Sequence, residues 1–300
     1  MDSGTKIRSV TLTGGTDSNK QIQALKQGID IIIATPGRLD DFLSNGHVSL
    51  DNVRFLVLDE ADAIIKDNKK FIENVHRGCP FAHPADGKKL QVIVCSATLH
   101  NFDIKKLAQN IMKFPTWVDL KGQDSVPDTV HHCVCLVKPK LDRTWETNNF
   151  YKTDGVHLKD RTTAGTNSSE QWSESVKILK AQYTLRFIQA HKCDKGMIFC
   201  RTKLDCDNME NFLRKNDKNI TCACLHSDRK PQERQANLAA FKNDKVKFLI
   251  CTDVAARGID VKGIPFVINV TLPDMKENYR AFEKNFGSVF AQNCGVYHIL

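Results

Sequence analysis

The sequence predicts an α/β protein made of two parallel-sheet units in tandem. Short apolar runs without polar–apolar alternation, such as residues 53–58 and 196–200, are typical of strands buried on both faces of a sheet. Apolar residues at helical spacing, such as Ile64, Ile65 and Phe71, separate these runs. Strands that alternate with helices indicate a parallel sheet, and a polar interruption near residue 121 divides the chain into two units.

The first unit, residues 1–120, is expected to begin with a short strand within 7–15 that ends in a glycine turn. Gly28 is expected to close the first helix, because glycine readily adopts the left-handed conformation that follows many helix ends. The remaining elements are expected in chain order: helix 18–28, strand 29–34, a helix after Arg38, strand 53–58, helix 62–78, strand 90–95, helix 101–113 and strand 117–120.

A polar linker with Pro127 is expected at 121–128, followed by the second unit, residues 129–300. Residues 138–172 are rich in polar side chains and are interpreted as a surface insertion that is partly disordered. Strands are expected at 130–137, 196–200, 220–225, 246–251 and 264–270, helices from Trp172 and at 204–215 and 230–242, and a closing strand at 295–300.

Composition narrows the class of protein. A hydrophobic fraction of 41% and a charged fraction of 26% are those of a soluble globular chain, and no apolar run reaches membrane-spanning length. The net charge of +8 favours a polyanionic partner, with nucleic acid ahead of a membrane, although a basic surface without a specific role is an alternative.

Eleven cysteines occur, and several lie inside apolar runs: Cys95, Cys200, Cys222, Cys224 and Cys251. This placement fits reduced, buried thiols in an intracellular protein. The segment His131–Cys135 resembles a metal-binding cluster, but its ligands would alternate across a strand, so a strand is predicted there and no zinc site.

Polar clusters follow several predicted strands. Asp59, Glu60 and Asp62 come directly after the strand 53–58, where a nucleotide would bind beyond the carboxyl end of a parallel strand. Asp59 is placed to hold Mg²⁺ through water, and Glu60 to orient an attacking water. A solvated acidic turn is the alternative interpretation. Further clusters are 35–38, 96–98, 199–202 and 252–260, and those of the two units are expected to face each other across a cleft.

These clusters together resemble one family. Asp59-Glu60-Ala61-Asp62, with Thr35-Pro36-Gly37-Arg38 before it and Ser96-Ala97-Thr98 after it, resembles the DEAD-box RNA helicases. Residues 199–202 and 252–260 are similar to the fourth and fifth motifs of that family, and the resemblance runs from about residue 10 to about 279. Residues 117–122, 126–132, 200–208 and 225–234 are similar to the family member that carries a SPRY domain inserted in its first core domain.

The resemblance implies two tandem RecA-like domains, the first incomplete at its N-terminus. It implies an ATP-dependent RNA helicase that uses ATP and Mg²⁺, binds RNA within RNA-processing ribonucleoprotein complexes, and works in cytoplasm and nucleus.

Residue roles follow from the same resemblance. Asp59 is expected at Mg²⁺ and Glu60 as the hydrolytic base, while Asp62, Ser96 and Thr98 would couple hydrolysis to domain closure. Contacts to the nucleotide are expected from Arg257, Gly258 and Asp260. Contacts to the RNA backbone are expected from Gly15, Thr35, Pro36, Gly37, Arg38, Arg201, Thr202, Thr252 and Asp253.

Each role has a structural alternative. Ser96 and Thr98 could cap the following helix, Arg38 could pair with Asp40 or Asp41, and Asp260 could cap a turn.

The chain departs from the family pattern in two places. No GxxxxGK[ST] phosphate loop occurs, and the segment after Tyr279 lacks the arginine-rich run that supplies the arginine finger. We therefore expect a fragment with weak or no ATP hydrolysis, a first unit that is only marginally stable because a strand edge is open, and a second unit that folds well alone. The alternative is a non-catalytic RNA-binding or interaction protein, a shortened helicase paralogue.

Overall fold

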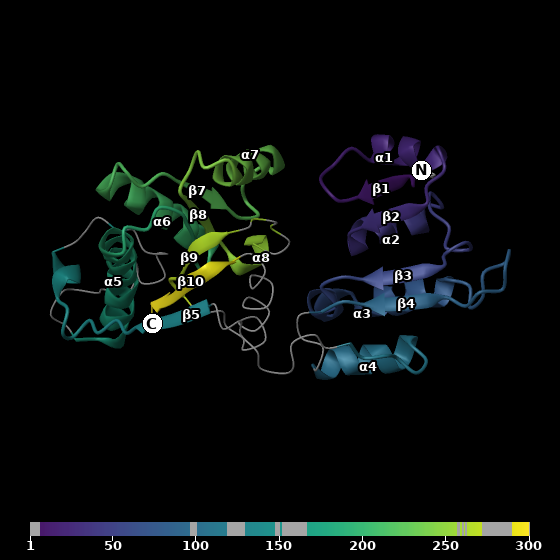
Figure 1. Cartoon of the computed structure of the whole chain (residues 1–300), viewed down its shortest axis with the longest axis horizontal. Coiled ribbons are helices and arrows are strands. Elements are labelled where there is room, and N and C mark those ends of the chain that lie inside the picture. Colours follow the sequence, from purple (N-terminus) through teal and green to yellow (C-terminus); the bar gives the residue numbers. More distant parts are fainter. Residues whose placement is uncertain are drawn as a thin grey trace. The chain divides into compact units, whose positions relative to one another are not determined.

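The computed structural model describes residues 7–96, 101–118, 130–147, 151, 167–256, 259, 261, 263–271 and 290–299. The chain divides into two compact units, residues 1–123 and 124–300, which are described one at a time (Figure 1). The predicted linker at 121–128 lies outside the described residues. None of the described helices is both long and apolar enough to cross a membrane.

The first unit contains two separate two-stranded parallel sheets. Strand β1 (Ser9–Leu12) pairs with β2 (Ile31–Ala34), and β3 (Phe55–Leu58) pairs with β4 (Gln91–Val94). Four helices connect and follow them: α1 (Ser18–Lys26), α2 (Pro36–Ser44), α3 (Ala61–Gly78) and α4 (Phe102–Ile111). Trp117 and Val118, expected to begin a strand, lie outside regular structure, and 119–120 are outside the described residues.

Each of these sheets is covered by helices on one face. Val10 and Leu12 pack with Phe42 of α2. Partly buried residues of α1, such as Ile22 and Leu25, pack against this cluster. Leu56 and Leu58 of β3 pack with α3 and α4, where Ile104 and Leu107 are fully enclosed. Burial therefore alternates along β1, β3 and β4, whereas the three isoleucines of β2 are all exposed.

The opposite face corrects the prediction of strands buried on both sides. Phe55 is 60% exposed and Val57 55% exposed, and Ile31 and Ile33 of β2 are also exposed. In β2, Ile32 is exposed as well. In β3 and β4 the physical reason is that side chains alternate across a strand, and one layer of helices covers only one side. Cys95, predicted to be buried, is exposed for the same reason, since it continues the β4 strand.

The second unit is built around a six-stranded sheet in which every pair is parallel, in the order β5-β10-β9-β6-β8-β7. The strands are β5 (Val130–Cys135), β6 (Gly196–Phe199), β7 (Cys222–Leu225), β8 (Phe248–Cys251), β9 (Ile264–Asn269) and β10 (Phe290–Ile299). The helices are α5 (Ser169–Ala190), α6 (Lys203–Asn216), α7 (Pro231–Lys242), the short α8 (Asp253–Ala256) and the 3₁₀ turn η1 (Thr144–Glu146).

Strands β6, β7 and β8 are buried along their whole length, as the unbroken apolar runs predicted. Their side chains divide between two cores, one containing Ile198 and Ile250 and the other Met197 and Leu249. Gly196 allows a close approach here, because a Cβ at this position would lie 2.8 Å from the carbonyl oxygen of Phe266. The second unit therefore has the doubly covered sheet that the described part of the first unit lacks.

The predicted closing strand is present and longer than expected, since β10 begins at Phe290. It lies between β5 and β9, and Val296 pairs with His132 on one side and Val267 on the other. His298 is buried on β10, with Nε2 3.1 Å from Nδ1 of His132 and Nδ1 3.1 Å from the Asn269 side-chain amide nitrogen. Burial, and then the neighbouring His132, lower the pKa of His298 to about 4.

Most described residues of the segment 138–147 are exposed, as a surface insertion would be, but a few aromatic side chains of the segment 138–172 pack within the second unit. Trp145 is buried, donates from Nε1 to the Pro139 carbonyl at 3.1 Å, and packs edge-on against Trp172. Tyr151 is buried against Phe212. The polar composition of the segment gave no sign that Trp145, Tyr151 and Trp172 would pack in this way. Residues 148–150 and 152–166 lie outside the described residues.

The exchange rates of backbone amide hydrogens are expected to differ between the two units. Backbone amides of β6 and β8 should exchange most slowly, because they are hydrogen-bonded in a sheet covered on both faces. Amides of β3 and β4 should exchange faster, since one face of that pair is exposed. Native-state exchange followed by mass spectrometry measures this difference. Equal protection in β3 and β8 would contradict it.

The lowered pKa of His298 predicts acid sensitivity of the second unit. Between pH 6.5 and about 4 the unfolded chain binds a proton that the folded chain excludes, so stability is present above this window and is lost as the pH falls. From pH 6.5 to 5 the loss should be roughly 2 kcal/mol at most. Denaturant unfolding at both pH values, compared with His298→Asn, tests this; an equal acid loss in the variant would contradict it.

Candidate functional site

The acidic turn Asp59–Asp62 lies beside the segment that follows β4. The amide of Cys95 donates to the Leu58 carbonyl at 2.8 Å, and the amide of Ala61 donates to the Cys95 carbonyl at 3.0 Å. Because β3 and β4 are parallel, both segments leave the sheet at the same edge. The structure thus brings Asp59 and Glu60 next to Ser96 within one unit.

Glu60 has an unusual backbone conformation at the start of α3. It is the N-cap residue and is left-handed, with φ 49° and ψ 44°. A side chain other than glycine is strained there, and such strain is concentrated at functional sites. The Asp59 carboxylate accepts a hydrogen bond from the Glu60 amide at 2.9 Å. The turn therefore fixes one oxygen of Asp59, whose side chain is exposed at the sheet edge.

Ser96 does not cap the next helix. Asn101 is the N-cap of α4 and accepts from the Asp103 amide at 3.0 Å. Asp62 lies in the first turn of α3, where a carboxylate is favoured by the helix dipole. Thr98 lies outside the described residues.

The residues around Arg38 follow the carboxyl ends of the other strand pair, β1 and β2. The Arg38 guanidinium hydrogen-bonds Ser18 and donates to the Thr16 carbonyl at 3.3 Å, and it lies 5.4 Å from the Phe42 ring centroid. It also pairs with Asp41 at 3.7 Å, the ion pair considered as an alternative. Arg38 therefore ties the loop after β1 to the start of α2.

The loop and helix start that Arg38 joins carry the other predicted residues. Gly15 has φ +74°, and Thr35 is the N-cap of α2 with Pro36 in the first turn. Thr35 makes no side-chain capping bond. Backbone amides of a first helical turn, such as that of Gly37, point out of the helix and suit an anion.

In the second unit, two strand ends meet. The Cys200 amide donates to the Cys251 carbonyl at 3.0 Å, which places Arg201 and Thr202 beside Thr252 and Asp253. The Thr202 hydroxyl accepts from the Asp205 amide at 3.0 Å and donates to its carboxylate at 2.8 Å. Thr202 thus caps α6. Arg201 is exposed at this edge, whereas Arg257, Gly258 and Asp260 are outside the described residues.

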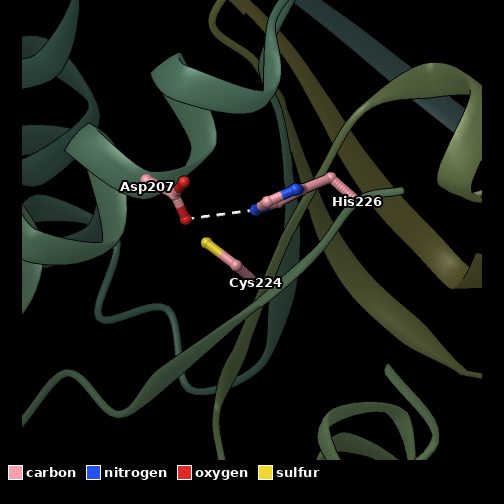
Figure 2. A group of neighbouring side chains, drawn as sticks. All are labelled: Asp207, Cys224 and His226. Carbon is pink, nitrogen blue, oxygen red and sulfur yellow. Dashed lines mark hydrogen bonds and ion pairs between the residues drawn. The ribbon is translucent and has the colours of Figure 1, made fainter. Parts of the chain in front are cut away.

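Sequence reasoning missed one polar cluster. Asp207 of α6, Cys224 of β7 and His226 bring one ligand atom each within 4.8 Å of one another (Figure 2). His226 Nε2 lies 3.1 Å from Asp207 Oδ1, and burial raises the pKa of the Cys224 thiol. Asp207 lies 17 positions before Cys224 and 19 before His226, so no local spacing pattern would have revealed the cluster.

The negative charge of Asp207 in this cluster is balanced by Arg229. Its Nη2 donates to Asp207 at 2.6 Å, and it also pairs with Glu210 at 3.2 Å and Glu233 at 2.8 Å. A metal ion bound to Asp207 would lie against this guanidinium. The cluster is therefore an ion-pair network that joins α6 to α7.

Comparison with known proteins identifies the family of the chain. Residues 1–107 match the model of the DEAD/DEAH box helicases, and residues 177–286 match that of the helicase conserved C-terminal domain. The chain belongs to the DEAD-box helicase family.

Two curated relatives of this DEAD-box chain are "ATP-dependent RNA helicase DDX1" of Xenopus laevis and "ATP-dependent RNA helicase Ddx1" of Drosophila melanogaster. The first is 56% identical over 91% of the chain and the second 52% over 92%. DDX1 is the SPRY-containing member that the sequence resembles. The chain spans 38% of the length of each.

Solved structures show the fold. Dbp5 of S. cerevisiae bound to RNA and ADP BeF3 has a TM-score of 0.68 at 20% identity, over 99% of this chain and 64% of that one. Mss116p bound to ssRNA and AMP-PNP has a TM-score of 0.71 at 21% identity, over 97% and 52%. The predicted α/β class with tandem RecA-like domains is confirmed.

The strained backbone of Glu60 predicts an unusual response to mutation. Glu60→Gly should make the first unit roughly 0.5–1 kcal/mol more stable than Glu60→Ala, because only glycine adopts the left-handed conformation without steric cost. Both variants remove the carboxylate, so the comparison isolates the backbone. Urea unfolding monitored in the first unit measures it; equal stability of the two would contradict strain at this residue.

Proposed function

We propose that this DEAD-box chain carries out RNA binding and part of the ATP hydrolysis of an ATP-dependent RNA helicase. The observation that carries the proposal is the backbone pairing that sets Asp59 and Glu60 against the Cys95–Ser96 segment. The same unit holds the Arg38 edge, so acids for hydrolysis and donors for RNA lie on one small domain. Its relatives in Xenopus laevis and Drosophila melanogaster are named ATP-dependent RNA helicases, which supports it.

The acidic turn fits Mg²⁺ and a nucleophilic water. Mg²⁺ prefers oxygen ligands and retains its waters, which suits the exposed carboxylate of Asp59. When bound, the ion neutralises charge on the β- and γ-phosphates of ATP. Glu60, the next residue, would orient and deprotonate the attacking water. Asp62, Ser96 and Thr98 are proposed to link this step to the closure of the two domains.

The RNA backbone would be held by helix starts and arginines. The first turn of α2, with Thr35, Pro36 and Gly37, offers amides to a phosphate, and Arg38 fixes the neighbouring Gly15 loop. In the second unit, Arg201 and Thr202 share an edge with Thr252 and Asp253. Contacts of this kind read phosphates rather than bases, so the RNA sequence would matter little.

Nucleotide contacts from Arg257, Gly258 and Asp260 are proposed on the resemblance of the sequence alone. The 300 residues contain no phosphate-loop motif, which would supply the amides and the lysine that hold the β/γ-phosphates. ATP turnover by this chain by itself is therefore predicted to be weak or absent. Work within ribonucleoprotein complexes of cytoplasm and nucleus is proposed by the same resemblance.

The test is RNA-stimulated ATP turnover and RNA binding by the purified chain, with Glu60→Gln as the matched control. We expect binding of single-stranded RNA that weakens by roughly 0.7 units of log Kd per unit of log salt for each phosphate contact. Arg201→Ala should weaken it. Turnover at the level of the Glu60→Gln control is expected.

Turnover that Glu60→Gln abolishes would show that another phosphate cradle exists in the chain. Failure of the chain to bind RNA at low salt would refute the RNA-binding part of the proposal.

A further inference from the structure

A basic and aromatic surface lies at one end of the first unit, away from the helicase motifs. Residues 81–90 connect α3 to β4 and therefore lie at the amino ends of the strands. The acidic turn lies at their carboxyl ends, about 13 Å away along a four-residue strand. This surface, which we call the Phe81 patch, consists of Phe81, Lys88, Lys89, Lys113 and Phe114.

The patch is built on an ordered hairpin. Ala82 and Lys89 form an antiparallel bridge, and the Leu90 amide donates to the Phe81 carbonyl at 3.0 Å. Inside the turn, the His83 amide donates to the Lys88 carbonyl at 2.8 Å, and Gly87 supplies the positive φ of +62°. Asp86 ties the turn to Arg54, immediately before β3, at 2.6 Å. The loop therefore presents its side chains from a fixed backbone.

Large aromatic rings are exposed on this frame. Phe81 is 62% exposed, and two ammonium groups contact its ring, Lys89 Nζ at 5.6 Å and Lys113 Nζ at 5.0 Å from the centroid. Lys113 follows α4, so the hairpin and the end of that helix meet at Phe81. The next residue, Phe114, is 99% exposed and has a left-handed backbone, with φ +51°. A partner that covers these two exposed phenylalanines would gain the free energy of burying their apolar surface.

The charge at this end is positive. The hairpin with its neighbours Arg54 and Lys113 carries four cations, at Arg54, Lys88, Lys89 and Lys113, against one carboxylate. That carboxylate, Asp86, is already paired with Arg54 at 2.6 Å and lies 3.8 Å from Lys88. Lys89 and Lys113 face only the Phe81 ring among the contacts described. A partner would therefore have to be both anionic and able to stack on phenylalanine.

We propose that the Phe81 patch binds a stretch of single-stranded RNA, separate from the RNA bound at the motif edges. Aromatic rings that stack bases, with lysines that follow the phosphates, are the usual combination for single-strand binding. The lysines now over Phe81 can turn to phosphates while a base takes their place on the ring. The choice of RNA rests on the proposed function of the chain, and the experiment below separates the two.

The experiment combines photocrosslinking with binding. The whole chain is mixed with a long single-stranded oligouridylate that contains 4-thiouridine, irradiated, digested and analysed by mass spectrometry. Crosslinks to the peptide containing Phe81 are expected, and they should persist in Arg201→Ala. Phe81→Ala should weaken binding of the long RNA by about five- to a hundredfold. Lys89→Ala with Lys113→Ala should lower the log–log salt slope by about 1.4.

The matched control is Lys20→Ala with Lys26→Ala, two exposed lysines of α1 outside the patch. It should leave both the salt slope and the Phe81 crosslink unchanged. An unchanged thermal midpoint in each variant shows that the fold is intact.

Three results would overturn the proposal. Crosslinks confined to peptides around 35–38 and 201–202, with wild-type affinity in the patch variants, would refute the patch and leave the proposed function standing. Absence of any RNA binding would refute both. Displacement of the RNA from the Phe81 peptide by poly-glutamate at equal charge would show that the patch accepts an acidic polypeptide instead.

Discussion

The parallel direction of the strands is the constraint on which the candidate sites depend. Parallel strands all end at one edge, so residues distant in sequence meet there without long-range side-chain contacts. The pairing of Leu58 with Val94 places the acidic turn beside Ser96, and the pairing of Phe199 with Cys251 places Arg201 beside Thr252. A shift of either pair by one residue would turn these side chains to the opposite face.

The sequence was sufficient for most strands and helices, although not for the strand expected at 117–120, and for the strand ends where the motifs lie. Unbroken apolar runs identified β6, β7 and β8, and the same reasoning found β3 but misjudged its burial. A run of apolar residues shows that a strand can be covered on both faces, whereas its actual cover depends on which other elements pack there. Phe55 and Val57 are exposed because the described helices lie on one face only.

Other features could not be predicted because they depend on contacts between distant residues. The cluster of Asp207, Cys224, His226 and Arg229 forms only after α6 packs beside β7. The left-handed backbone of Glu60 could not be predicted either. Glutamate favours a helix interior, and only the geometry of the turn gives it a φ of 49°. Trp145 and Tyr151 were concealed by polar neighbours, because composition averages over a segment and burial is decided by single side chains.

The position of β10 has a consequence for synthesis on the ribosome. Strand β5 is made early in the second unit, yet its partner in the sheet is β10, which follows roughly 150 residues later. At about 5–20 residues per second, β5 waits on the order of ten to thirty seconds with an unpaired edge. Throughout that interval the backbone groups of β5 that later pair with β10 lack this partner, and an open strand edge of this kind promotes aggregation.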